Sequence, residues 1–385
     1  MVCDRTTPAG KHNKRIASIF FTRLNRINNR AKDKTNHHQT VILNRMIPSI
    51  YDGLNMASKI SARRAWNASQ VLTSYWRSRF SHQPSIAGMP VSISIEPTTS
   101  CNLRCPECPS GLRSFTRPTG MLQQPVFENV IDQLAPTLSY LIFYFQGEPF
   151  LHPSLLNMVE YAARQNIYTA TSTNAHFLTS EMAEKTVRSG LDRLIISIDG
   201  TTQQSYESYR VGGKLDKVLE GTRQILYWKK QLKSKTPQVV FQFLVVKQNE
   251  HQVPDIRRMA SEMGVDHVAL KTAQIYDFKN GSPLMPVNPK YSRYRKQIDG
   301  TYEVKNQLLD HCWKMWHSCV ITWDGKVVPC CFDKDAHFVL GDVTNQSFEE
   351  IWRGEAYQKF RKSLLQSRSE IEMCRNCTEG TQIWA

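Results

Sequence analysis

The sequence predicts an α/β fold in which short strands alternate with helices from residue 91 to about residue 273. Two observations predict it. Short runs rich in Val, Ile and Phe recur along this region, and amphipathic stretches of about ten or more residues separate them. This alternation is typical of βαβ units, which build a parallel sheet. Six such repeats fit either an open doubly wound sheet or a barrel-like curl, and both place functional residues at the carboxyl ends of the strands.

The expected elements follow from the residue pattern. The apolar runs predict strands over residues 91–95, 141–145, 167–173, 193–198, 239–246 and 267–272. The amphipathic stretches predict helices over residues 123–135, 153–165, 179–189, 214–232 and 252–263. After about residue 275 the alternation gives way to a Pro- and Lys-rich connector, which is followed by a region rich in Cys and Trp.

Composition bounds the class of protein. The chain has 385 residues, enough for two domains, and 41% of them are hydrophobic, enough for packed cores. No run of about 18 apolar residues occurs, so we expect no membrane-spanning helix. The net charge of +15 is uneven, because residues 1–46 hold ten Lys and Arg against two acidic residues, a net +8.

We expect residues 1–46 to be a poorly ordered basic arm. The alternatives are a tail for nucleic acid or for an anionic membrane, or a segment that weakly resembles an organelle transit peptide. Residues 47–87, which include Trp66, Trp76 and Arg77, predict an amphipathic helix that packs on the body or contacts a surface. Peripheral membrane contact through this basic region is therefore one expectation. Because the arm lacks the apolar core of a secretory signal, we expect a cytoplasmic protein.

Cysteine spacing is the strongest chemical signal. Cys101, Cys105 and Cys108 form a C-x3-C-x2-C motif on a loop directly after the first expected strand. Three thiolates at this spacing can converge on an iron–sulfur cube and leave one iron without a protein ligand. The alternatives are a zinc knuckle or cysteines that only pack. In a chain of this size, tight clusters of cysteine indicate metal or redox chemistry rather than a disulfide framework.

A second group of cysteines lies in the tail. The segment WDGKVVPC, residues 323–330, predicts a β-hairpin that turns at its Asp-Gly pair. Cys374 and Cys377 form a C-x2-C pair, which together with Cys312 and Cys330 can supply four thiolates to one centre. On chemistry alone this centre is either an iron–sulfur cluster or a four-cysteine zinc site.

Small and polar residues stand at the carboxyl ends of the expected strands. A Gln-Gly-Glu-Pro tetrapeptide after the second strand can offer backbone carbonyls and a carboxylate to an ammonium group, although alone it is an ordinary turn. For the side chains after the third and fourth strands, the alternative is a helix cap or turn. The candidate binding residues are Gly147, Glu148, Pro149, Thr173, Asn174, Ser197, Asp199 and Arg210, with Gln242 and Lys271 as candidate substrate contacts.

Together these motifs resemble the radical S-adenosylmethionine (SAM) superfamily, and the tail resembles its SPASM/twitch extension in the short form with one cluster. The resemblance departs at Glu107, where the family often has an aromatic residue, and at Gln146, which replaces a glycine. It implies a partial (β/α)6 TIM-like barrel with a small C-terminal cysteine-rich iron–sulfur module. The implied division is an arm (1–46), a helical segment (47–87), a radical SAM core (88–275), a connector (276–304) and an auxiliary cluster domain (305–385).

The resemblance also implies the cofactors. One [4Fe-4S] cluster would bind SAM on Cys101, Cys105 and Cys108. A second, auxiliary [4Fe-4S] cluster would lie on Cys312, Cys330, Cys374 and Cys377, with Cys319 and Cys331 left over. The tetrapeptide would face the SAM amino group, the residues after the third and fourth strands its ribose and carboxylate, and Arg210 its carboxylate.

The activity implied by the resemblance is reductive cleavage of SAM, after which a 5′-deoxyadenosyl radical abstracts hydrogen from a substrate. The expected use is peptide or protein modification or maturation, with a flavodoxin or ferredoxin as one-electron reductant. The alternative is a radical SAM dehydrogenase of a small carbohydrate-like alcohol. A distant alternative is a non-catalytic iron–sulfur or zinc protein that binds nucleic acid. The modest basic excess outside residues 1–46 argues against a nucleic-acid partner.

Overall fold

The computed structural model describes residues 50–380. These residues belong to one compact unit. The arm expected over residues 1–46 lies outside them. No helix in this part of the chain is long and apolar enough to cross a membrane.

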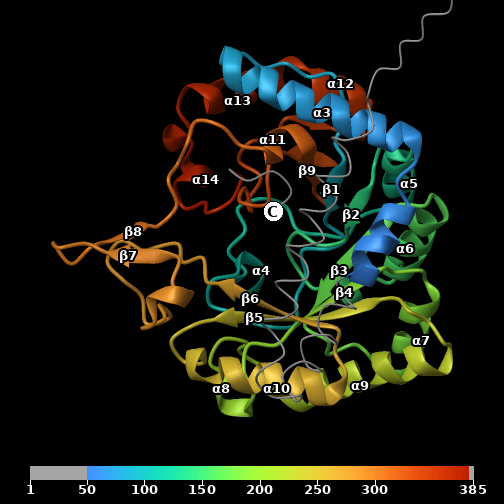
Figure 1. Cartoon of the computed structure of the whole chain (residues 1–385), viewed down its shortest axis with the longest axis vertical. Helices are drawn as coiled ribbons and strands as arrows, with labels where there is room; N and C mark the ends of the chain where they lie inside the picture. Colours follow the sequence, from blue (N-terminus) through green and yellow to red (C-terminus); the bar gives the residue numbers. More distant parts are fainter. Residues whose placement is uncertain (1–49, 381–385) are drawn as a thin grey trace, which may run out of the picture. The chain divides into compact units, whose positions relative to one another are not determined.

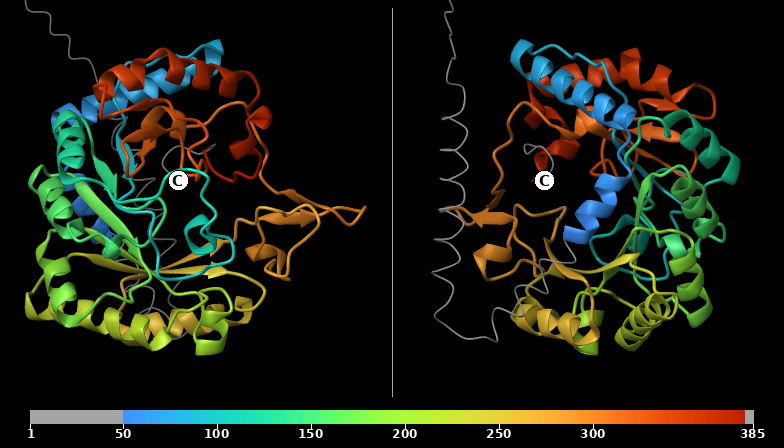
Figure 2. Two further views of the ribbon diagram at one scale, coloured as in Figure 1. Left: turned by 180° about the vertical axis from the view of Figure 1, so that it is seen from behind. Right: turned by 45° about the vertical axis from the view of Figure 1, so that its right-hand side comes forward.

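A nine-stranded sheet organises the described chain (Figure 1). Its strand order is β11-β10-β9-β1-β2-β3-β4-β5-β6, and each neighbouring pair from β1 to β6 is parallel. The six parallel strands curl into a partial barrel with the helices on the outside (Figures 1 and 2). The parallel strands are β1 (Ser92–Ile95), β2 (Tyr140–Ile142), β3 (Tyr168–Thr173), β4 (Arg193–Ser197), β5 (Gln238–Val245) and β6 (His267–Thr272).

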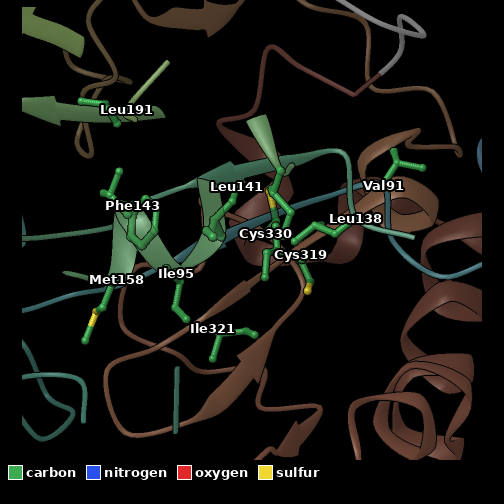
Figure 3. Packing of buried hydrophobic residues seen from close by; sticks show 14 of the residues in the cluster. Val91, Ile95, Leu138, Leu141, Phe143, Met158, Leu191, Cys319, Ile321 and Cys330 are labelled. Carbon is green, nitrogen blue, oxygen red and sulfur yellow. The ribbon is translucent and has the colours of Figure 1, made fainter. Parts of the chain in front are cut away.

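The outer helices confirm the expected periodicity to within two residues at each end. In α5, Phe127, Val130, Ile131 and Leu134 recur at helical spacing and are fully buried, so this face packs onto the sheet. The Phe127 ring lies 5.6 Å from that of Phe143, and Figure 3 shows Phe143 within this buried cluster. The five helices are α5 (Gln124–Leu134), α6 (Leu155–Arg164), α7 (Ser180–Arg188), α9 (Leu215–Gln231) and α10 (Val253–Met263).

Strand β2 is shorter than the sequence predicts. It was expected to continue to Phe145 but ends at Ile142. The chain bends over residues 145–147, and Gly147 adopts a positive φ of 73°. The Gln-Gly-Glu-Pro turn therefore begins before the apolar run has ended, because the turn geometry overrides the strand propensity of Phe143 and Phe145.

The segment before the barrel is tied to the amino ends of the strands. Residues 50–58 are helical, and Asp52 accepts hydrogen bonds from Tyr168 at the start of β3 and from Arg193 at the start of β4. Nearby, the Lys59 ammonium is paired with the buried Asp192. Helix α3 (Ala62–Ser81) follows, with Ser61 as its N-cap. The expected amphipathic helix is confirmed, and its buried face packs on the body.

The tail shares the sheet of the core. Strands β9 (Ser318–Ile321) and β10 (Lys326–Val328) form the expected hairpin, with Gly325 at φ 84° in its turn. Strand β9 also pairs in parallel with β1, which the sequence did not predict. The remaining elements of the tail are β11 (Gly341–Asp342), α11 (Lys314–His317), α12 (Phe348–Arg353), α13 (Glu355–Gln366) and α14 (Glu372–Arg375).

The connector contains structure that the sequence analysis missed. Strands β7 (Tyr294–Lys296) and β8 (Tyr302–Val304) form a separate two-stranded sheet. Gly300, at φ 87°, lies in the intervening loop. Each strand has only three residues, too few for a period of two to be recognised.

Candidate functional site

The loop after β1 presents the first three cysteines. Cys108 is the N-cap residue of the short helix α4 (Pro109–Leu112), and the Leu103 amide donates to the Cys101 Sγ at 3.5 Å. A Cβ at Gly111 would lie 2.6 Å from the backbone nitrogen of Cys105. Glycine is therefore required for the loop to fold tightly over the start of α4.

The three thiols lie close enough to influence one another. Burial is the main cause that raises the pKa of Cys101 to about 12, and the charges of Cys108 and Cys105 raise it further. Burial also raises the pKa of Cys105, whereas the Arg210 guanidinium, 3.9 Å from its sulfur, lowers it. Buried thiols of this kind become thiolates when a metal centre supplies positive charge.

The arrangement of both cysteine groups differs from a single-ion site. Within residues 50–380, no group of three or more His, Cys, Asp and Glu side chains is arranged to hold one metal ion. The cysteines of an iron–sulfur cube bind different iron atoms, so they lie farther apart than the ligands of one zinc ion.

The Gln-Gly-Glu-Pro turn packs directly against the cysteine loop. The Gly147 amide donates to Ser110 Oγ at 2.9 Å, and the Glu148 amide donates to the Ser100 carbonyl at 2.8 Å. A Cβ at Gly147 would lie 2.2 Å from the Thr98 carbonyl oxygen. Only glycine combines this close approach with the positive φ, so the turn positions the loop that carries the cysteines.

The buried Glu148 carboxylate joins two strand ends. It accepts from Thr173 Oγ1 at 2.7 Å, from the Asn174 amide at 2.7 Å and from the Phe150 amide at 3.2 Å. Burial raises the pKa of Glu148, and these donors lower it. The Asn174 side chain in turn donates to Asn102 Oδ1 at 2.8 Å. Three predicted site residues are thus joined to one another and to the cysteine loop.

Replacing Glu148 with Gln is expected to lower the free energy of unfolding by about 1–3 kcal/mol. The amide nitrogen of Gln would face a donor, the Asn174 amide or the Thr173 hydroxyl, and leave a buried polar group unsatisfied. Chemical denaturation checks this. The matched control is Glu160→Gln on α6, where the carboxylate forms an exposed i,i+4 pair with Arg164 and the change should be small. Equal effects of the two substitutions would contradict the account.

Two more predicted residues form a buried ion pair beside Cys105. The Arg210 Nε donates to Asp199 Oδ2 at 2.5 Å, and the other Asp199 oxygen accepts from the Leu244 amide at 2.7 Å. Arg210 therefore links the end of β4 to the cysteine loop. Ser197, the last residue of β4, is buried and stands opposite Gln242 of β5.

Three of the predicted tail ligands gather around one buried arginine, Arg368. Arg368 Nη2 lies 3.2 Å from Cys377 Sγ. Burial raises the pKa of Cys374 to about 12, and Arg368 lowers it. Burial likewise raises the pKa of Cys312, which Arg368 also lowers. The pKa of Cys330 is raised mainly by a side-chain hydrogen bond with Cys331 and by burial, and the nearby Cys312 raises it further. Three of the four predicted tail ligands, Cys312, Cys374 and Cys377, thus lie around a cation that favours their thiolate forms, and the fourth, Cys330, lies near Cys312 and Lys314.

The two cysteines left over have different surroundings. Cys319 is buried in β9 within the hydrophobic core, and Figure 3 shows it beside Ile321. Cys331 is exposed, and Lys314 Nζ lies 3.9 Å from its sulfur. Packing therefore accounts for Cys319.

A cavity of about 1050 Å³ runs along the inner face of the barrel. Alternate residues of β1, β2, β4, β5 and β6 line it, as the two-residue period of strands requires. It reaches Cys330 and Cys331 in the tail, and it includes Gln242 and Lys271, the two candidate substrate contacts. His152 is not among the residues that line the cavity, and its ring Nε2 lies 2.8 Å from the Leu122 carbonyl oxygen.

Several residues that hold the site were missed from the sequence. Glu96 and Arg117 form a buried bidentate ion pair at 2.6 and 2.8 Å, and the Trp323 amide also donates to Glu96. Asn102, Ser110 and Arg368 were missed as well. Among these residues, only Glu96 could have been recognised from the sequence, because it is a carboxylate that directly follows a buried strand.

Sequence comparison decides the family. The model of the radical SAM superfamily matches residues 95–260, and the model of SPASM, an iron–sulfur cluster-binding domain, matches residues 312–378. The chain belongs to the radical SAM superfamily.

Individual radical SAM proteins are similar over most of this chain. A tungsten-containing aldehyde ferredoxin oxidoreductase cofactor-modifying protein from Pyrococcus furiosus is 24% identical over 69% of this chain and 82% of its own. PqqA peptide cyclase from Gluconobacter oxydans is 24% identical over 77% of this chain and 84% of its own.

Solved structures agree in fold. anSMEcpe with bound AdoMet has a TM-score of 0.57 and 17% identity, covering 76% of this chain and 86% of its own. Streptococcus suis SuiB bound to precursor peptide SuiA has a TM-score of 0.56 and 14% identity, covering 82% and 75%. The partial barrel is thus the radical SAM fold.

The protein is therefore an enzyme whose family implies SAM, a [4Fe-4S] cluster and auxiliary iron–sulfur binding. The residues fit these groups, since cysteine thiols occur in two groups and a guanidinium lies beside each. When bound, the cluster and SAM supply one-electron reduction and hydrogen abstraction.

Proposed function

We propose that this radical SAM enzyme modifies a peptide held in the barrel cavity. The observation that carries the proposal is that one cavity joins the inner face of the sheet to Cys330 and Cys331 of the SPASM region. A substrate in it would touch both parts of the chain. Its volume of about 1050 Å³ is slightly above the range for small-molecule pockets, about 300–1000 Å³, so several residues of a peptide fit.

The comparisons support this choice of substrate. PqqA peptide cyclase is a relative by sequence, and SuiB shares the fold and was solved with a precursor peptide. Relatives that modify a cofactor or make heme show that the family also serves other substrates. The peptide class is therefore a proposal for this chain.

Different residues of the chain would bind the two clusters, SAM and the substrate. Cys101, Cys105 and Cys108 would hold the SAM-binding cluster, and Cys312, Cys330, Cys374 and Cys377 the auxiliary cluster. The SAM contacts would come from the predicted strand-end set, in which backbone atoms of the Gly147 turn face the amino group, because the Glu148 carboxylate already has three donors. Gln242 and Lys271 on the cavity wall would contact the substrate.

Near the amino ends of the strands, the segment before the barrel lines the cavity. Asp52, Met56 and Ile60 contribute to its wall, and Asp52 is paired there with Arg193. A one-electron reductant of the flavodoxin or ferredoxin class completes the proposal.

Deuterium transfer tests the substrate class. Anaerobic, reduced enzyme is incubated with SAM and with perdeuterated candidate peptides or deuterated carbohydrate-like alcohols, and 5′-deoxyadenosine is analysed by mass spectrometry. We expect deuterium in 5′-deoxyadenosine with a peptide. Transfer from an alcohol only would overturn the peptide assignment in favour of a dehydrogenase.

A further inference from the structure

The outward side of helix α3 carries large aromatic side chains that the proposed reaction does not use. Phe80 is 78% exposed, Trp66 67% and Trp76 36%. Together with the exposed Arg77 they lie on one side of the helix. We call these four residues the α3 face. Exposed aromatic side chains in such a group mark a surface that contacts a partner.

The charge of this helix restricts the partner. Its 20 residues contain four arginines and no acidic residue. Arg64 is buried and donates to backbone carbonyls, but Arg63 and Arg77 are exposed. The Arg79 guanidinium lies over the Trp76 ring at 5.0 Å. The surface is therefore basic and aromatic, and its complement is an acidic one.

The opposite side of α3 leads to the auxiliary centre. Tyr75 is buried, and its ring lies 5.5 Å from the ring of exposed Trp76 and 5.2 Å from that of Trp313. Trp313 directly follows Cys312, a predicted cluster ligand. Two ring contacts thus separate the surface from the residue next to the tail cysteines.

We propose that the α3 face docks an acidic one-electron carrier protein, of the flavodoxin or ferredoxin class, that exchanges electrons with the centre at Cys312. In each encounter one electron passes between carrier and centre, so one is oxidised and the other reduced by one electron, and no bond forms or breaks. The proposal rests on the proposed function, because only a redox centre in the tail gives the carrier something to exchange.

The dimensions suit such an encounter. A helix of this length extends about 30 Å, and complexes of electron carriers are small, below about 1200 Å² of buried surface. Trp and Arg are the residue types that contribute most to binding at interfaces. An anionic membrane would also attract this helix, but the ring contacts to Trp313 favour a redox protein.

Binding affinity tests the proposal. The cluster-loaded enzyme is titrated calorimetrically with an acidic flavodoxin and an acidic ferredoxin as probes, at low and high salt. We expect Arg77→Glu and Trp76→Ala each to raise the Kd by about tenfold or more. High salt should also raise the Kd of the wild type. The matched control is Arg257→Glu, an exposed arginine on α10, which should stay within about twofold.

Other outcomes overturn the proposal. A Kd unchanged in both α3 variants would exclude the α3 face as the docking site. Loss of binding to phosphatidylserine-containing vesicles in Arg77→Glu, with no carrier binding by the wild type, would assign the face to a membrane instead.

A separate assay distinguishes failure of this proposal from failure of the proposed function. Dithionite-driven formation of 5′-deoxyadenosine should be unchanged in Arg77→Glu. If the wild type forms none, the proposed function fails, whatever the α3 face binds.

Discussion

Replacing Cys105 with Ala is expected to abolish SAM cleavage and to remove about four of the about eight iron atoms per chain that two [4Fe-4S] clusters contain. Cys105 is buried beside Arg210, and the other two cysteines of the loop are themselves predicted ligands of the same cluster. Iron analysis and 5′-deoxyadenosine quantification after anaerobic reconstitution measure both effects.

The matched control is Cys319→Ala. This thiol is also buried, but it lies in β9 within the hydrophobic core. The variant should keep its iron and its SAM cleavage and lose only a small part of its stability. If Cys319→Ala lost as much iron as Cys105→Ala, the assignment of the loop cysteines as the ligands of the SAM-binding cluster would be wrong.

Replacing Cys377 with Ala is expected to separate the two centres. The auxiliary cluster should be lost, with about four iron atoms per chain, whereas SAM cleavage at the loop should remain and modification of the substrate should stop. The Arg368 guanidinium would lose its 3.2 Å contact with the sulfur, and the loss of one partner of this buried cation lowers stability. Iron content, 5′-deoxyadenosine and modified product are measured on the same preparation.

Cys331→Ala is the control for this second variant. Cys331 neighbours the predicted ligand Cys330 but is exposed, and it was not assigned to the cluster. We expect its iron content to match that of the wild type. A loss of about four iron atoms in Cys331→Ala, with none in Cys377→Ala, would reverse the assignment of the tail ligands.

Local patterns predicted most of the barrel. The run from 267 to 272 matches β6, and α10 begins one residue after the expected helix, because hydrophobic periodicity is a property of neighbouring residues. The pairing of β9 with β1 joins residues more than 200 positions apart. No short-range pattern carries such a register, so the tail was expected as a separate module although it extends the core sheet.

The same distinction applies to the site. The spacing of Cys101, Cys105 and Cys108 is local, and it predicted the cluster loop. The partners of Glu148 come from β3 and from the short 3-10 helix Pro149–Leu151. Arg368, which contacts Cys377, belongs to another short 3-10 helix, Arg368–Glu370. These contacts depend on how strands and loops pack, so the sequence predicted which residues stand at the strand ends but not which of them bind one another.

The central claim is that the loop cysteines and the tail cysteines each hold an iron–sulfur cluster and that the first serves SAM cleavage. The most direct measurement is anaerobic reconstitution of the whole chain with iron and sulfide, followed by metal analysis and a dithionite-driven assay for 5′-deoxyadenosine. The account predicts about eight iron atoms per chain and 5′-deoxyadenosine that forms only with dithionite. About one zinc per chain with no SAM turnover would contradict it.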